Sequence, residues 1–132
     1  MILIDSCVLF DVMTNDPEWY EWSAGALAVA AVDFDLAINP IIYAEVSVRF
    51  ATPDDFSEMF PHDEFRRIPL PFGAAFLAGK AHFEYRRRGG FRTATLPDFF
   101  IGAHAAVANY KIMTRDPRRF RRYFPTVELI AP

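Results

Sequence analysis

The sequence predicts an α/β fold of three layers (α/β/α), in which helices cover both faces of a central, mostly parallel sheet. Short apolar segments rich in β-branched residues alternate with longer segments of helical character along the 132 residues. This alternation is typical of parallel strands joined by helices. Hydrophobic residues make up 52% of the chain and include 14 Phe, which is enough for a real core. Because no linker or repeat interrupts the pattern, we expect one domain over residues 1–132.

The first half is expected to hold two strands, the first of them buried, and four helices. In chain order these are a strand over 1–4, helices over 7–13 and 17–31, a strand over 34–38, and helices over 41–50 and 53–60. Ser6 is a plausible N-cap of the first helix, and Pro17 suits the first turn of the second. Asn39 is expected to cap the next helix, which Pro40 begins.

The second half is expected to continue the same alternation. In chain order we expect a strand over 65–70, a helix over 72–88 closed by Gly89-Gly90, a loop over 91–96, a helix over 97–110, a strand over 111–113, a short helix from 116–117 to 122, and a strand over 126–130. Pro69 lacks an amide donor, which makes the strand over 65–70 an edge strand. Asp116-Pro117 is expected to cap the short helix.

Composition indicates a cytoplasmic protein. The single cysteine, Cys7, excludes an intramolecular disulfide and fits a reducing compartment. A helix N-terminus could lower the pKa of this thiol, but a small buried residue is the favoured interpretation. No uninterrupted apolar stretch is long enough to cross a bilayer, and Met1 leads directly into a strand rather than into a secretory signal. We therefore expect no contact with a membrane.

The charge of the chain is unevenly distributed. The formal net charge is −3, yet 11 of the 14 Lys and Arg residues lie from Lys80 onward, together with only 4 of the 17 Asp and Glu residues. Such asymmetry favours a polyanionic partner, above all a nucleic acid, for the basic half. The alternative is a dipolar surface that is simply solvated.

Four acidic residues are the candidate chemical groups. Asp5 and Asp116 follow predicted strands, Asp98 opens a helix, and Glu45 lies on the helix after Asn39. The carboxyl ends of parallel strands form the crevice in which α/β proteins bind ligands. Converging carboxylates repel one another unless they share protons or a cation, and a hard cation such as Mg²⁺ suits oxygen ligands. Each acid also has a structural alternative: a helix cap for each aspartate, and a solvated position for Glu45.

In their order along the chain, these motifs resemble the PIN-domain nucleases, and among them the VapC-type toxins of toxin–antitoxin pairs. The resemblance covers almost the whole chain and is carried by Ile4-Asp5-Ser6, Glu45 after Asn39-Pro40, Leu96-Pro97-Asp98-Phe-Phe-Ile-Gly-Ala103, and Thr114-Arg115-Asp116 followed by Phe120. It implies a PIN-like α/β/α fold and a metal-dependent endoribonuclease that arrests growth by cutting tRNA or rRNA. Many relatives have Asn where this chain has Cys7, and Ala where it has Gly102.

The resemblance also implies roles for individual residues. Asp5, Asp98 and Asp116 would lie nearest to one or two Mg²⁺ or Mn²⁺ ions, and Glu45 would act through water. Such an ion lowers the pKa of bound water and neutralises charge on the scissile phosphate. Ser6 and Thr114 could hydrogen-bond a metal water or a carboxylate, although capping a helix is an equal alternative for Ser6.

Two arginine clusters are expected to bind the RNA backbone. The first contains Arg86, Arg87, Arg88 and Arg92, and the second contains Arg115, Arg118, Arg119, Arg121 and Arg122. Phosphate contacts of this kind give affinity without sequence information. Phe91 could stack on an unpaired base. For any single arginine, a solvated helix end is an even alternative.

The resemblance further implies a homodimer and a cognate antitoxin that lies across an apolar groove. Aromatic residues that could line such a groove crowd the early helices, although residues of this kind usually form core: Trp19, Tyr20, Trp22, Phe50, Phe56, Met59 and Phe60. Two other functions remain open. A non-catalytic PIN-like module would bind RNA or protein only. An aspartyl-phosphate phosphatase would also begin with a strand and an aspartate, but it would need a second aspartate where this chain has Cys7.

Overall fold

A five-stranded parallel sheet forms the centre of the computed structural model, which describes residues 1–89 and 96–132. The strand order is β3-β2-β1-β4-β5, and all four pairings are parallel. The strands are β1 (Ile2–Ile4), β2 (Leu36–Ile38), β3 (Arg66–Arg67), β4 (Lys111–Met113) and β5 (Leu129–Ile130). The expected α/β class is confirmed, and β3 lies at an edge as expected.

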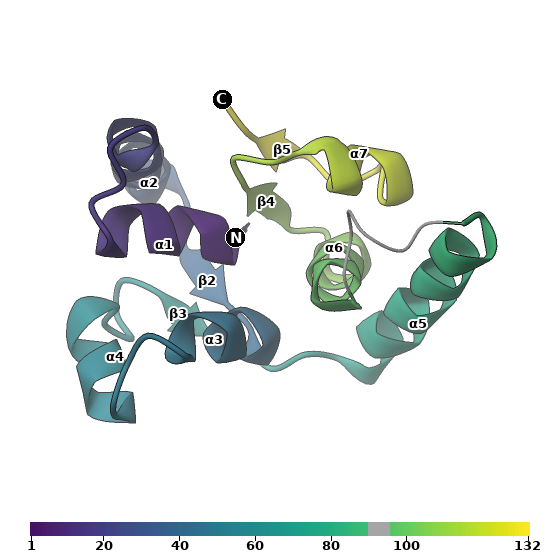
Figure 1. The fold of residues 1–132 in the computed structure, drawn as a ribbon, viewed down its shortest axis with the longest axis horizontal. Helices are drawn as coiled ribbons and strands as arrows, with labels where there is room; N and C mark the ends of the chain where they lie inside the picture. The colour runs from purple at the N-terminus through teal and green to yellow at the C-terminus, as the bar shows by residue number, and fades with distance from the viewer. Residues whose placement is uncertain (90–95) are drawn as a thin grey trace.

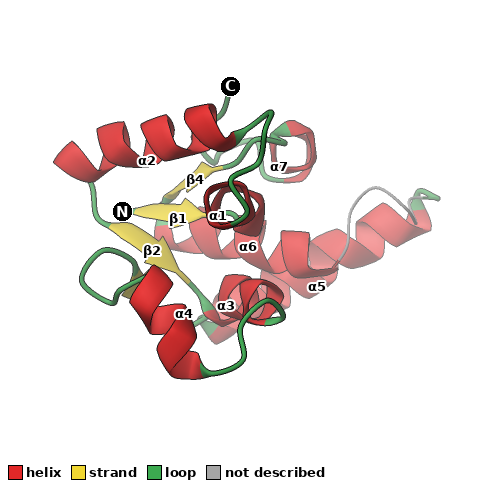
Figure 2. Ribbon diagram, turned by 60° about the vertical axis from the view of Figure 1, so that its left-hand side comes forward, coloured by secondary structure: helices red, strands yellow, loops and turns green. Residues whose placement is uncertain are grey.

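Seven helices connect and cover these strands in the described part of the chain. They are α1 (Ser6–Met13), α2 (Tyr20–Asp33), α3 (Pro40–Ser47), α4 (Pro53–Met59), α5 (Phe72–Arg87), α6 (Leu96–Ala108) and α7 (Arg118–Tyr123). Figure 2 shows them arranged around β1, β2 and β4. Among the described residues, no helix has the length and apolar character needed to cross a membrane.

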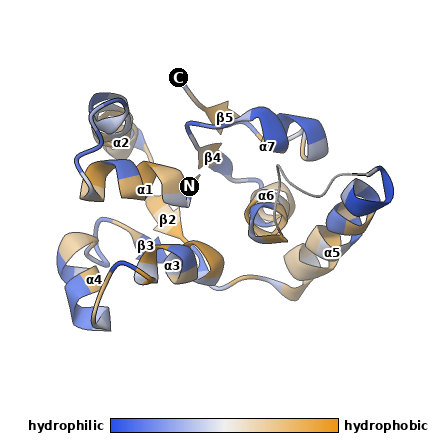
Figure 3. Cartoon of the chain, in the orientation of Figure 1, coloured by the Kyte–Doolittle hydropathy of each residue, from blue (hydrophilic) through white to orange (hydrophobic). Residues whose placement is uncertain are grey.

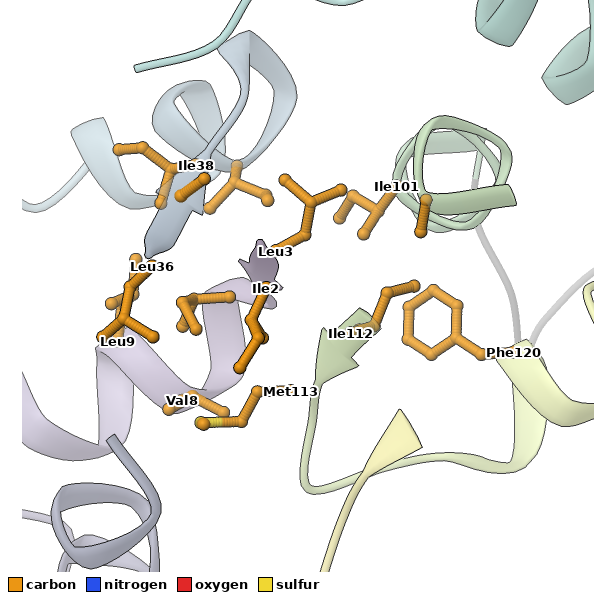
Figure 4. Packing of buried hydrophobic residues seen from close by; sticks show 14 of the residues in the cluster. Ile2, Leu3, Val8, Leu9, Leu36, Ile38, Ile101, Ile112, Met113 and Phe120 are labelled. Carbon is orange, nitrogen blue, oxygen red and sulfur yellow. The ribbon is translucent and has the colours of Figure 1, made fainter. Parts of the chain in front are cut away.

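The core lies on both faces of β1, whose three residues are completely buried. Successive side chains of a strand point to opposite faces of the sheet. In Figure 4, Leu3 accordingly points towards Ile101 of α6, and Ile2 points to the other side, towards Val8 of α1. Helices therefore cover the central strand on both faces, as the uninterrupted apolar run at the start of the chain predicts.

Several predicted boundaries are wrong by a few residues. The helix expected from Pro17 begins at Tyr20, because Asp16 Oδ1 accepts hydrogen bonds of 2.9 Å from the amides of Glu18 and Trp19 and forms a turn there. The strands expected over 34–38, 65–70 and 126–130 are shorter, and α3 ends at Ser47 rather than at residue 50. β3 and β5 are edge strands, and each has a hydrogen-bonded neighbour on one side only. Fewer backbone hydrogen bonds are therefore available to lengthen them.

Two helix starts also differ from expectation. Asp5, rather than Ser6, occupies the N-cap position of α1, and Pro117, rather than Asp116, occupies that of α7. Neither cap residue makes a side-chain capping hydrogen bond. At the end of α5, Gly89 takes a left-handed conformation with φ of 86°, which agrees with the predicted helix end. Gly90 and the predicted loop with Phe91 and Arg92 lie outside the described residues.

Gly102 has a packing reason. A Cβ atom built at this position of α6 would lie 2.2 Å from a ring carbon of Phe124. Phe124 is buried, and its ring packs near the ring of Phe99, which lies on α6 like Gly102. The aromatic ring therefore occupies the space that a methyl group at position 102 would need.

Candidate active site

Asp5 lies at the carboxyl end of β1 and is only 4% exposed. Its amide donates a 2.9 Å hydrogen bond to the carbonyl of Met113 in β4, which fixes the backbone at the sheet edge. Its carboxylate accepts a 2.8 Å hydrogen bond from the Thr114 hydroxyl. The alternative of a side-chain helix cap is therefore wrong for Asp5. Burial raises the pKa of Asp5, and the bond from Thr114 acts in the opposite direction.

Thr114 connects two of the predicted acids. Its hydroxyl donates to Asp5 Oδ2 and also accepts a 3.1 Å hydrogen bond from the amide of Asp116. The fully buried threonine therefore fixes the start of the segment that carries Asp116. The thiol of Cys7 lies 3.4 Å from Asp5 Oδ2, and burial raises its pKa to about 12. Cys7 is thus a protonated, partly buried neighbour of Asp5, which agrees with the favoured interpretation of this residue.

Glu45 is half-buried on α3. Its Oε1 atom has no hydrogen-bond partner among the described residues. Burial raises the pKa of Glu45 to about 7, with further upward contributions from Asp5 and Asp98 and opposing ones from Ser6 and Arg119. A solvated helix face, the structural alternative for Glu45, does not describe this environment.

Arg119 lies between the other two acids. Its Nη1 donates to Asp98 Oδ2 over 2.9 Å, and its Nη2 lies 3.3 Å from Asp116 Oδ2. The Arg119 side chain is 28% exposed and that of Asp98 only 13%, whereas Asp116 is 36% exposed. The charge of the guanidinium also partly opposes the rise in the pKa values of Asp5 and Glu45 that burial causes. One arginine thus acts electrostatically on all four predicted acids.

The acidic residues of the site have the donor atoms of a metal centre, but their side chains are not arranged to hold a metal ion in this conformation. Carboxylate oxygens are the donors that Mg²⁺ and Mn²⁺ prefer, and the buried Oε1 of Glu45 lacks a hydrogen-bond donor. Among the described residues, however, no three His, Cys, Asp or Glu side chains are arranged closely enough to hold a metal ion in this conformation. The residues therefore fit a hard cation by their donor type, and a change of side-chain conformation would have to bring them together.

Asn39 makes two polar contacts that position the helices carrying Glu45 and Asp98. Asn39 caps α3 as predicted, with its Oδ1 accepting 3.0 Å hydrogen bonds from the amides of Ile41 and Ile42. Its Nδ2 lies 3.1 Å from Nδ1 of His104, which is buried on α6. Burial lowers the pKa of His104, which favours the neutral ring that can accept this bond. The contact ties the helix of Glu45 to the helix of Asp98.

Asp11 is a site-supporting residue that the sequence analysis missed. It is 1% exposed, accepts a 2.7 Å hydrogen bond from Ser23 and binds Arg115 Nε through both oxygens, at 2.9 and 3.1 Å. Arg115 directly precedes Asp116, and its guanidinium lies over the ring of Trp19. The only signal in the sequence was an acid within an otherwise apolar helix, which is weak evidence on its own.

The predicted arginine clusters divide into exposed and engaged members. Arg86, Arg87 and Arg88 are exposed at the end of α5, where Arg87 pairs with Glu84 at 2.8 Å. Arg118, Arg121 and Arg122 are exposed on α7, with Arg118 3.5 Å from Asp116. Figure 3 shows the hydrophilic end of α5 and the hydrophilic helix α7 on the same side of the molecule. Arg115 and Arg119, in contrast, are only 32% and 28% exposed and pair with the buried Asp11 and the largely buried Asp98.

Some of the large apolar residues of the early helices belong to the core, and others line a surface hollow. Phe56 and Phe60 are buried and pack against each other and against Phe50. Met59 remains 44% exposed and contributes to a hollow of about 470 Å³ between α2 and the segment from α4 to β3. Leu27, Phe34 and acidic side chains also line this hollow, which does not include any of the four predicted site acids.

Comparison with known proteins identifies a matching family. The model of the PIN domain matches residues 2–124, which include all of the predicted site residues. No curated protein sequence matches the chain.

Solved structures with similar folds are numerous, and all of those considered are less than 25% identical in sequence. VapBC2 from Rickettsia felis, solved bound to a DNA fragment from its promoter, has a TM-score of 0.76 at 19% identity, with 100% of this chain and 99% of that chain covered. VapBC-1 from nontypeable Haemophilus influenzae gives 0.75 at 16%, covering 99% and 98%. FitAcB from Neisseria gonorrhoeae gives 0.71 at 19%, covering 98% and 96%. At this level of identity the similarity establishes the fold.

Proposed function

The chain belongs to the PIN-domain family, and on this basis we propose that it is the toxin of a cytoplasmic toxin–antitoxin pair and acts as a metal-dependent endoribonuclease. The observation that carries the proposal is that Arg119 contacts both Asp98 and Asp116, while the charges of Asp98 and Arg119 also act on Asp5 and Glu45. A binding module would not need such acids beside exposed arginines. A nuclease needs both, because it must hold a cation and a phosphate backbone together.

Asp5, Asp98 and Asp116 are the proposed ligands of Mg²⁺ or Mn²⁺. When bound, such an ion would lower the pKa of water and neutralise charge that builds on the scissile phosphate. Thr114 holds the Asp5 carboxylate in place through its 2.8 Å hydrogen bond. Ser6, at the start of α1, acts on Glu45 in the direction that lowers its pKa and is proposed to help orient it.

Glu45 is the proposed general base. A base works best when its pKa lies near the working pH, and burial raises the pKa of Glu45 to about 7. Its Oε1 lacks a hydrogen-bond donor among the described residues, so this lone pair is free to accept a proton from the attacking water. The leaving ribose oxygen must also take up a proton, for which solvent suffices.

The exposed arginines of α5 and α7 are proposed to bind the RNA backbone. Arg86, Arg88 and Arg118 are exposed, and the hydrophilic end of α5 and the hydrophilic helix α7 lie on the same side of the molecule (Figure 3). Contacts of guanidinium groups with phosphate give affinity and orientation rather than sequence preference. The substrate proposed from this arrangement is therefore a structured RNA, such as tRNA or rRNA, whose shape presents one bond to the acids.

The proposed partners are a cognate antitoxin and a second copy of the chain. The similar structures include a toxin–antitoxin complex, and the hollow between α2 and α4, lined by apolar residues with three acids and Arg66, is the proposed place for a chain segment of an antitoxin. On α5, Phe72, Phe76 and Phe83 are 95, 71 and 63% exposed on one side of the helix. Exposed phenylalanines at this spacing support a homodimer through α5.

The test is cleavage of total cellular RNA by purified, antitoxin-free protein. The reaction is run with Mg²⁺, with Mn²⁺ and with a chelator, for the parent protein, for Asp98→Asn, and for Asp54→Asn, which changes an exposed acid on α4. We expect a discrete product that requires metal, is absent with Asp98→Asn and persists with Asp54→Asn. RNA binding without cleavage under every condition would instead support a non-catalytic module.

A further inference from the structure

The position of Arg119 is unusual for a residue expected to bind RNA. Its two terminal nitrogens contact carboxylates from different segments, Asp98 on α6 and Asp116 before α7. Both acids are proposed metal ligands. The guanidinium therefore occupies the position between two carboxylates where a divalent cation would also be most stable.

The charge balance of the site supports the same view. One guanidinium carries a single positive charge, yet Arg119 contacts two carboxylates, at 2.9 Å and 3.3 Å. With Arg119 in place, no three of the described acidic, His or Cys side chains are close enough to one another to hold a metal. The observed arrangement is thus organised around the arginine.

We infer that Arg119 is a built-in counter-ion of the acidic site, and that it competes with the divalent cation for Asp98 and Asp116. This inference rests on the metal site of the proposed function. Metal entry then requires the guanidinium to leave both carboxylates. Because the Arg119 side chain is partly exposed, it can move into solvent. Once released, Arg119 is available to a phosphate of the substrate, which it cannot contact while it is paired with both acids.

The test is a titration of metal-free protein with Mn²⁺, followed through the electron paramagnetic resonance signal of free Mn²⁺ and without RNA. Arg119→Gln removes the guanidinium. Arg121→Gln, at an exposed position on the same helix, removes the same charge and serves as the matched control. We expect Arg119→Gln to bind Mn²⁺ at least about fivefold more tightly than the parent, the lower end of typical coupling between competing ligands. Arg121→Gln should change the affinity by much less.

A second readout covers the case in which the glutamine variant folds poorly. Arg119→Lys keeps a positive charge but cannot bridge two carboxylates with a planar fork, so its Mn²⁺ affinity should lie between those of the parent and Arg119→Gln. In the parent, the Nε–H resonance of Arg119 in a ¹⁵N spectrum should shift when Mg²⁺ is added.

The outcomes separate this inference from the proposed function. Equal or weaker Mn²⁺ binding by Arg119→Gln, or no Mn²⁺ binding by either protein, would overturn the competition between Arg119 and the metal. Weaker binding would make Arg119 a residue that positions the carboxylates for the ion. Tighter Mn²⁺ binding by Arg119→Gln, together with no RNA cleavage by the parent protein, would support the role of Arg119 as a counter-ion and reject the proposed nuclease activity.

Discussion

The hydroxyl of Thr114 donates a 2.8 Å hydrogen bond to Asp5, although 109 positions separate the two residues in the sequence. The contact follows from the sheet. Ile4 at the end of β1 pairs with Met113 at the end of β4, so the residues that follow these parallel strands emerge together at one edge. The bond therefore joins the first and last segments of the candidate site.

Loss of this hydrogen bond should weaken both the site and the fold. Thr114→Val keeps the shape of the side chain but removes the hydroxyl donor of the buried Asp5 and leaves it only the weaker thiol of Cys7, so we expect about 1 kcal/mol lower stability and slower RNA cleavage. Thr114→Ser keeps the hydroxyl and should stay close to the parent in both respects. Urea unfolding and cleavage assays on the same preparations measure the two effects. Equal behaviour of the valine and serine variants would argue against the bond.

The stability of the metal-free protein should depend on pH through Glu45. Its folded-state pKa of about 7 lies above the ordinary value of 4.5, so the folded state binds this proton more tightly than the unfolded state does. The resulting stability is fully present below pH 4.5 and is lost as the pH rises through about 7. In chelator, Glu45→Gln should therefore gain stability relative to the parent over this range.

Unfolding in urea at a series of pH values measures this difference. Glu58→Gln, a change at an exposed position of α4, controls for the loss of one negative charge. A difference between parent and Glu45→Gln that stays constant across the range would show that Glu45 has an ordinary pKa in the folded protein.

The buried ion pair of Asp11 should matter far more than an exposed one of equal length. Asp11→Ala removes the partner of Arg115 and of the buried Ser23, and we expect it to cost about 3 kcal/mol. Asp35→Ala breaks a 3.0 Å pair with Arg66 in which both side chains are more than half exposed, and it should cost less than about 1 kcal/mol. Chemical denaturation of both variants provides the comparison, and similar costs would contradict the structural role given to Asp11.

Gly102 should not tolerate even one methyl group. The Cβ of Gly102→Ala would meet the ring of Phe124 at 2.2 Å in a packed core, so we expect a loss of about 1–3 kcal/mol. At Gly79, within α5, nothing lies within 4 Å of a Cβ atom, and alanine should gain up to about 1 kcal/mol from its helix propensity. Thermal melts of the two variants should therefore move in opposite directions. A stabilised Gly102→Ala variant would mean that Phe124 repacks without cost.

The sequence was most informative where a local rule decides the structure. The apolar run before Asp5, the cap at Asn39 with Pro40 after it, and the glycine after α5 each fix a boundary through short-range chemistry. The wrong boundaries lie where local signals compete. The side chain of Asp16 accepts a backbone hydrogen bond and forms a turn, so α2 begins later than predicted. The edge strands β3 and β5 are short because each has a hydrogen-bonded neighbour on one side only.

The sequence by itself determined the α/β class, because hydrophobic periodicity is a local property, and it named the four acids of the candidate site as a prediction. Only the tertiary structure decided what those acids contact. It assigned Arg119 to Asp98 and Asp116, Arg115 to the buried Asp11, and Asp5 to Thr114 rather than to a helix cap. Charged side chains are long and follow no periodicity, so their partners depend on the packing of distant segments, which the linear pattern does not contain.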